Sequence, residues 1–222
     1  MVKPKRPYKD RNSTRNRRKL KKRFLIVCEG TKTEPNYFEA IGKQIKQKVN
    51  LVIKREGKVT LSLVKEAKRL KDEDGGYKQD SNDEVWCVFD RDAKTENNNQ
   101  QNFNEAIRLA YSNNINLAIS NDAFELWFLL HYSYYQSETH RSDFEDKLKK
   151  RMGKKYKKNN PELYYKFKDL TEDAIKYAKK LWNSHDQNIA PNLNEIDKLI
   201  TKHNINPSTT VHQLVEKLIQ YL

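Results

Sequence analysis

Apolar residues along this chain fall into short runs separated by longer segments with helical spacing. Four runs are mostly apolar and β-prone, as expected of strands inside an α/β sheet, and they span 24–28, 50–54, 85–89 and 115–119. Apolar residues between the runs recur every three or four positions. We therefore predict helices that begin near Thr33 and Thr60, and others around 103–111 and 123–131.

Strands that alternate with helices predict an α/β fold, here a mostly parallel four-stranded sheet flanked by helices. From Ser142 onward no segment is typical of a strand, and we predict helices near 142–152, 171–183, 193–203 and 208–221. The predicted organisation is a basic, flexible arm (1–23), an α/β domain (24–135) and a helical C-terminal extension (136–222). Whether the extension is a separate subdomain or packs on the sheet stays open.

The net charge of +14 is concentrated at the N-terminus, where residues 1–23 hold twelve Lys and Arg and one acid, Asp10. Such a block favours a nucleic-acid-binding arm, and a solubilising tail is the alternative. The candidate phosphate contacts in the arm are Arg15, Arg17, Arg18, Lys19, Lys21 and Lys22.

A second basic block, 147–158, holds eight Lys and Arg and no acid. Tyr156 lies inside it, with Tyr164, Tyr165 and Phe167 just beyond, and aromatic rings among basic residues suit stacking on unpaired bases. A solvated helix face over a small aromatic core is the alternative. The candidate nucleic-acid contacts outside the arm are Arg151, Lys154, Lys155 and, in the loop before the first helix, Lys32.

Several classes of protein are not indicated. No run of 18 apolar residues is present, and the N-terminus lacks the pattern of a secretory signal, so we expect a cytoplasmic protein without membrane contact. Cys28 and Cys87 lie in apolar runs and are expected to be buried thiols. The chain has no Walker-type phosphate loop, no Gly-x-Ser-x-Gly elbow and no ligand-spaced histidine cluster.

Acidic residues follow the predicted strands. Glu29 ends the first strand, Asp90 and Asp92 end the third, and Asn121-Asp122 follow the fourth. Carboxyl ends of parallel strands meet at one sheet edge, where α/β proteins bind ligands, and carboxylates suit Mg²⁺ or Mn²⁺. With a cationic arm, this edge predicts metal-assisted cleavage of phosphodiesters. Taken alone, Asp90-Arg91-Asp92 is also compatible with a solvated loop.

Four motifs in this order resemble the RloB-like proteins of bacterial phage defence, a group similar to the Toprim fold. They are LIVCEGTKTEPNYF (25–38), VFDRD (88–92), SNDAFELWFLLHY (120–132) and NPSTTVHQLV (206–215). The resemblance implies that Glu29 acts in acid/base work or metal binding, and that Asp90 and Asp92 bind metal. It also implies a Mg²⁺-dependent endonuclease, acting on RNA such as tRNA in preference to DNA, with an ATPase partner encoded nearby. The chain departs from the family's Asn-Pro pattern at Asn121-Asp122.

Other candidate residues carry two interpretations each. Asp122 and Glu125 have the spacing of a capping box or belong to a shell around the site with Asn121. Glu34 complements a helix dipole or reaches the Glu29 edge. His131 has helical spacing with Trp127 and Phe128, which is typical of a semi-buried histidine, whereas its motif favours a catalytic role.

Two rival functions stay open. One is a non-catalytic sensor that binds nucleic acid or a partner ATPase, and the other is primase-like phosphoryl transfer on nucleotides. Three crowded carboxylates favour a cation and catalysis over the sensor, because without a cation they would repel one another. The target nucleic acid, the oligomeric state and the trigger are not determined by the sequence.

Overall fold

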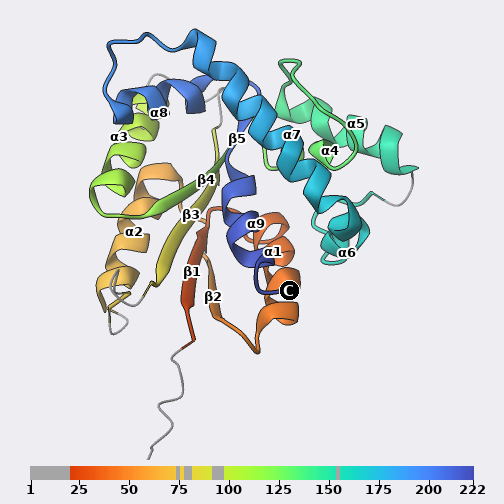
Figure 1. The fold of residues 1–222 in the computed structure, drawn as a ribbon, viewed down its shortest axis with the longest axis horizontal. Coiled ribbons are helices and arrows are strands. Elements are labelled where there is room, and N and C mark those ends of the chain that lie inside the picture. Colours follow the sequence, from red (N-terminus) through yellow and green to blue (C-terminus); the bar gives the residue numbers. More distant parts are fainter. Residues whose placement is uncertain (1–20, 74–75, 78–81, 92–97, 154–155) are drawn as a thin grey trace, which may run out of the picture.

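The computed structural model describes residues 21–73, 76–77, 82–91, 98–153 and 156–222. Within these residues a five-stranded sheet forms the centre of the molecule (Figure 1). Its first four strands in the chain pair in parallel and the fifth is antiparallel to β4. In spatial order the strands are β2 (Asn50–Arg55), β1 (Arg23–Cys28), β3 (Glu84–Asp90), β4 (Asn116–Asn121) and β5 (Ser208–Thr209).

Helices cover both faces of the sheet, which confirms the predicted α/β architecture (Figure 1). Two short 3₁₀ segments, Lys168–Leu170 and His185–Asn188, flank α7. In chain order the helices are α1 (Thr33–Ile45), α2 (Thr60–Glu73), α3 (Asn98–Ser112), α4 (Glu125–Leu130), α5 (Arg141–Met152), α6 (Leu163–Phe167), α7 (Thr171–Ser184), α8 (Glu195–Asn204) and α9 (Val211–Ile219).

Alternation along the strands produces two apolar cores, because successive side chains of a strand point to opposite faces. Phe24 and Ile26 of β1 belong to the core covered by α1, α4, α6, α7 and α9. Leu25 and Val27 belong to the other core, which α2 and α3 cover. Burial on both faces explains why β1 is a continuous apolar run.

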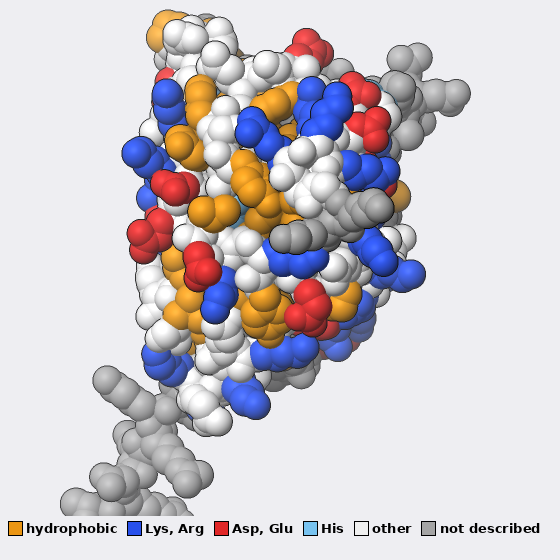
Figure 2. Space-filling model, turned by 90° about the vertical axis from the view of Figure 1, so that its right-hand side faces the viewer, with side chains coloured by type: hydrophobic (Ala, Val, Ile, Leu, Met, Phe, Trp, Pro, Cys, Tyr) orange, Lys and Arg blue, Asp and Glu red, His pale blue; other side chains and the backbone are white. Residues whose placement is uncertain are grey.

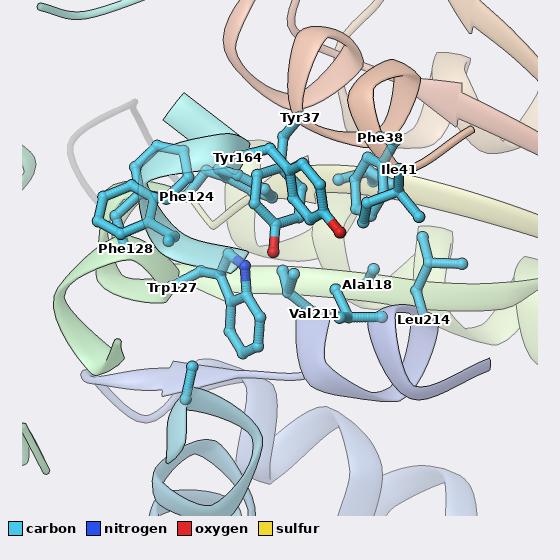
Figure 3. Packing of buried hydrophobic residues seen from close by; sticks show 14 of the residues in the cluster. Tyr37, Phe38, Ile41, Ala118, Phe124, Trp127, Phe128, Tyr164, Val211 and Leu214 are labelled. Atoms are coloured by element: carbon cyan, nitrogen blue, oxygen red, sulfur yellow. The ribbon is translucent and has the colours of Figure 1, made fainter. Parts of the chain in front are cut away.

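An aromatic cluster joins three helices on the first face (Figure 3). The ring of Tyr37 on α1 packs edge-to-face against Phe124, just before α4, with centroids 5.8 Å apart, and against Trp127 of α4 at 6.5 Å. It packs in the same way against Tyr164 of α6, at 5.5 Å. The start of α1 is therefore held beside the start of α4.

The C-terminal extension packs on the sheet, which answers the question that the sequence left open. Phe144, Ala178 and Leu214 share a core with β1 and β3. The exact division at residue 135 stays a prediction.

The absence of strands after Ser142 was a wrong prediction, as was a last helix that begins at residue 208. Ser208 and Thr209 form β5, and α9 begins at Val211. The Thr210 hydroxyl accepts a hydrogen bond from the Ile119 N–H (3.0 Å), and the Thr209 and Ser120 hydroxyls bond each other (3.0 Å). A two-residue strand is too short to show alternation, so its pattern could not be read from the sequence.

Smaller predictions have mixed outcomes. Cys28 and Cys87 are free, buried thiols, as predicted. Helix α1 begins at Thr33, as predicted, and the Thr33 hydroxyl donates to Asn159 Oδ1 (2.7 Å). In the part of the chain that the structure describes, every helix is too short or too polar to cross a membrane.

The folded part begins before residue 23. Arg23 opens β1 and pairs with Asp83 (2.8 Å), and Lys22 pairs with Glu84 (2.5 Å). The predicted arm boundary at residue 23 is therefore too late. Arg15, Arg17, Arg18 and Lys19 lie outside the described residues.

A variant in which the nine Lys and Arg of residues 1–20 are replaced by Gln tests the arm. We expect weaker RNA binding and a shallower plot of log K against log salt, because each lost phosphate contact removes a slope of about 0.7 for single strands. The measurement is fluorescence anisotropy between about 50 and 200 mM salt. Over this range the affinity of a protein that makes roughly six phosphate contacts falls strongly as salt is added. An unchanged slope would contradict the arm prediction, and Lys65→Gln on α2 is the control for a single exposed charge.

Candidate active site

The ends of β1 and β3 bring Glu29 and Asp90 together, as the sequence predicts. The two strands are neighbours, and the Glu29 N–H continues their ladder by donating to the Val88 carbonyl (2.9 Å). The Glu29 carboxylate in turn accepts a hydrogen bond from the Asp90 N–H, with Oε2 and N 3.2 Å apart. Asp92 lies outside the described residues.

Glu34 on the first turn of α1 joins this edge. Glu34 is 8% exposed, and its carboxylate lies directly over Gly30. A Cβ atom at residue 30 would be 2.1 Å from Glu34 Oε2, so only glycine leaves room for this arrangement. Gly30 is not among the positive-φ glycines of the described chain. Glycine is therefore needed here because the Glu34 carboxylate approaches the backbone closely, and not because the backbone conformation is unusual. Of the two interpretations of Glu34, the structure supports the one in which it reaches the Glu29 edge.

A cavity of about 400 Å³ opens above these carboxylates. Its acidic wall comes from the end of β3, the first turn of α1 and the start of α4, and its other wall from the loop before α1 and the segment before α6. The lining residues are Gly30, Thr31, Lys32, Thr33, Glu34, Asp90, Phe124, Glu125, Lys158 and Asn159.

Two hydrogen bonds and one ion pair close the cavity on the α6 side. Asn159 accepts from the Thr33 hydroxyl, and its carbonyl accepts from Asn36 Nδ2 (3.2 Å). Lys158 Nζ lies 3.2 Å from Glu125 Oε1, and the Glu125 side chain is 7% exposed. Lys158 and Asn159 are residues of this site that the sequence did not single out individually, although Lys158 ends the second basic block.

Crowding of acids is the main electrostatic feature of the cavity. Burial raises the pKa of Asp90 well above its usual value, and the nearby Glu34 and Glu125 raise it further, whereas Arg141 opposes the shift. Burial likewise raises the pKa of Glu34, with Glu125 and Glu29 adding to the effect. Such a group of carboxylates is stabilised by any cation that enters among them.

Arg141 is a third cation at the site, beside Lys32 and Lys158, and was missed by the sequence analysis. Its Nη2 atom lies 3.1 Å from Asp90 Oδ2 and 3.1 Å from the Asp122 carbonyl oxygen. The buried Asp122 carboxylate accepts the Arg141 backbone N–H (2.9 Å) and so holds the start of α5 beside the end of β4. No sequence signal marks Arg141, because it follows a non-periodic segment.

Of the two interpretations of Asp122 and Glu125, the structure does not support the capping box. Phe124 is the N-cap residue of α4 and no side chain caps it, because Asp122 bonds Arg141 and Glu125 pairs with Lys158. Asn121 is buried and its Nδ2 atom donates to the His203 carbonyl (3.2 Å), away from the cavity lining. The Asn121–Asp122 peptide bond is cis.

His131 lies in the aromatic core and not in the cavity lining. It is 1% exposed, its Nδ1 bonds the Trp127 carbonyl oxygen (2.9 Å), and its ring packs against Trp127 and Phe167. Burial lowers the pKa of His131 to about 4. The structure thus supports the interpretation of a buried, neutral histidine.

The predicted basic contacts are dispersed. Lys32 lines the cavity and Arg151 is exposed on α5, whereas Lys21 donates to the Lys46 carbonyl and Lys22 pairs with Glu84. Lys154 and Lys155 lie outside the described residues.

The rings beside the second basic block do not form the predicted stacking surface. Tyr156, Tyr164 and Phe167 are buried, and only Tyr165 is exposed. The aromatic-core alternative holds for the three buried rings.

The metal site stays a prediction. Among the described residues no three His, Cys, Asp or Glu side chains are grouped as metal ligands, and the predicted third ligand, Asp92, lies outside that part of the chain. The chemistry of the edge nonetheless fits a hard divalent ion, since Glu29 bonds the Asp90 N–H at the sheet edge and Asp90 lines the cavity together with Glu34 and Glu125.

A model of the RloB-like protein family matches residues 24–218. The chain belongs to the RloB-like family. This confirms the resemblance carried by the four motifs, and the matched region contains every described residue of the cavity. Searches of curated proteins and of solved structures find no match to the chain.

Gly30→Ala tests the close approach of Glu34. We expect the added methyl group to displace the carboxylate, lowering stability and weakening stabilisation by Mg²⁺ in thermal unfolding. In a Glu34→Ala background the same change should have little further effect. The coupling energy in this cycle, measured by denaturant unfolding, should be on the order of 1 kcal/mol. Equal effects in both backgrounds would show that Glu34 does not occupy the space above Gly30.

His131→Phe tests the buried neutral histidine. Because the folded-state pKa is depressed, the unfolded chain binds a proton that the folded chain does not, so stability falls as pH drops from 6.5 toward 4. In the variant, the slope of the free energy of unfolding against pH should be smaller by about 1.4 kcal/mol per pH unit in this range. The measurement is denaturant unfolding at several pH values. Some pH dependence of stability should remain in the variant, because His203 and His212 are also buried and also have a lowered pKa. An unchanged slope would mean that His131 is protonated in the folded protein.

Proposed function

We propose that this protein is a Mg²⁺-dependent nuclease that cleaves nucleic-acid phosphodiesters. One observation carries the proposal: a single cavity combines an acidic wall (Glu34, Asp90, Glu125) with Lys32 and Lys158. Acidic oxygens suit a divalent cation, and lysines suit the phosphate that such a cation would bring with it. The family membership supports the same function.

Glu29, Asp90 and Asp92 would hold the metal. When bound, Mg²⁺ polarises the phosphate and lowers the pKa of an attacking water. The residues of the chain supply the remainder. Lys32 and Lys158 attract the phosphate, and Arg141 orients the Asp90 carboxylate through the bond to its Oδ2 atom.

Arg141 and Lys158 have a second role in this proposal. Both already neutralise carboxylates of the cavity, Asp90 and Glu125 respectively. A divalent ion that binds there would replace part of their pairing, and both cations would then be available to the substrate phosphate.

The substrate and biological context rest on the resemblance. RNA such as tRNA is favoured over DNA, an ATPase encoded nearby is the proposed partner, and anti-phage defence is the proposed setting. A non-catalytic sensor would use the same basic residues without turnover.

The test is a cleavage assay with total tRNA, single-stranded DNA and double-stranded DNA, with and without the neighbouring ATPase. Each reaction contains Mg²⁺, Mn²⁺ or EDTA. We expect metal-dependent RNA fragments and a loss of at least about 100-fold in Asp90→Asn, which keeps shape but loses the charge. Binding should change less than about threefold, because one carboxylate contributes little to phosphate attraction.

Asp146→Asn is the matched control, because Asp146 is a carboxylate exposed on α5. Thermal unfolding of both variants separates lost chemistry from lost fold, and Glu29→Gln replaces Asp90→Asn if the latter does not fold. Binding without fragments in every combination would favour the sensor over the nuclease.

A further inference from the structure

Four partly buried tyrosines form a surface that the cavity does not use. Tyr132, Tyr134 and Tyr135 lie in the connection between α4 and α5, and Tyr177 lies on α7. All four pack against the first apolar core, so each ring rests on a rigid support while part of it faces solvent. We call these residues the tyrosine surface.

Two of the rings lie beside each other, and the other two each pack against a ring of the core. The Tyr134 and Tyr177 centroids are 6.3 Å apart, and Tyr132 packs against Phe167 at 5.8 Å. Tyr135 packs against Phe144 at 6.5 Å. Supported rings of this kind lose little conformational entropy when a ligand stacks on them.

Lysines lie over two of the rings. Lys180 Nζ is 4.2 Å from the Tyr134 centroid, and Lys147 Nζ is 5.7 Å from that of Tyr135. The side of the molecule that carries α4–α7 shows hydrophobic side chains interspersed with Lys and Arg (Figure 2). A ligand for this surface must therefore present both flat apolar groups and negative charge.

The charge distribution points to a polyanion. Residues 131–180 hold 14 Lys and Arg against 8 Asp and Glu. Outside this stretch and the first 23 residues, the chain holds 18 Lys and Arg against 21 Asp and Glu. Outside the first 23 residues, the positive charge of the sequence is thus concentrated in the segment 131–180 that carries the four tyrosines.

We propose that the tyrosine surface binds an unpaired nucleic-acid strand, whose bases stack on the tyrosine rings while Lys147 and Lys180 contact its phosphates. Unpaired bases expose their faces, whereas bases in a duplex are already stacked on one another. This inference rests on the proposed nucleic-acid substrate and narrows it to a strand that is single-stranded where it meets the protein.

Most of the tyrosine surface is close to the cavity residues along the chain. Along the chain, three of the four tyrosines (Tyr132, Tyr134 and Tyr135) lie between Glu125, which lines the cavity, and Arg141, which bonds Asp90. A strand held on the tyrosine surface is therefore bound by the same segment that carries the Asp90-binding arginine.

The test measures binding of the full-length protein by fluorescence anisotropy in EDTA, so that no cleavage is needed. The probes are a 15-nucleotide single-stranded RNA and a 15-base-pair RNA duplex. We expect Tyr134→Leu/Tyr177→Leu, which keeps apolar cover over the core, to weaken single-strand binding by a factor of about 5 to 100. Duplex binding should change less than about twofold, because it depends on phosphate contacts.

Two matched variants serve as controls. Tyr134→Phe/Tyr177→Phe keeps the rings and should bind the single strand like the wild type. Tyr111→Leu removes a tyrosine that is 58% exposed on α3, outside the surface, and should leave binding unchanged. If the leucine pair does not fold, Tyr134→Leu alone replaces it, with a smaller loss that is still selective for the single strand expected.

Equal loss for both probes, no loss, or failure of the phenylalanine pair to bind would overturn the inference. Displacement of the RNA by polyglutamate with the same tyrosine dependence would overturn it in favour of an acidic protein partner. The nuclease proposal is tested separately. Tyrosine-dependent binding without cleavage would count against the nuclease alone, and cleavage with unchanged binding in the leucine pair would count against the surface alone.

Discussion

The packing of Tyr37 against Phe124, Trp127 and Tyr164 is the constraint on which the candidate site depends. These rings join α1, α4 and α6, three helices that are distant in the chain. Glu34 lies one turn before Tyr37, and Glu125 follows Phe124, so the same contacts that fill the core also set two carboxylates beside Asp90. Edge-to-face aromatic pairs have a preferred geometry, which apolar aliphatic packing lacks. The position of the acidic wall is thus decided by the core beneath it.

The acidic wall costs stability, and the cations around it offset part of that cost. Buried carboxylates close to one another raise each other's pKa, as Asp90 and Glu34 do here. Arg141 and Lys158 come from the C-terminal half and each pairs with one carboxylate. The extension therefore completes the site electrostatically as well as covering the sheet. Groups of buried carboxylates with raised pKa values are typical of sites that bind a ligand of opposite charge.

The sequence could predict the part of the site that follows from strand order. Parallel strands end at one edge, so Glu29 and Asp90 had to be near each other once β1 and β3 were recognised. Arg141 and Lys158 could not be found in this way, because they reach the cavity from non-periodic segments whose course depends on packing. The sequence pattern also could not show which tyrosines are buried. Tyr156 lies among lysines in the sequence and is buried, whereas Tyr134 and Tyr135 have no lysine close to them in the sequence and are partly exposed.

The two residues of β5 have a consequence for how the chain reaches its final state during synthesis. They cover the outer edge of β4, and the Thr210 hydroxyl bonds the Ile119 N–H from the same segment. Until residue 210 has left the ribosome, the backbone groups at this end of β4 have no partner from β5, and an open strand edge is a template for pairing with other chains. A chain interrupted after α8 would hold most of its helices and still present that edge. Residues 208–210 are therefore what protects the carboxyl end of the β4 edge from pairing with another chain.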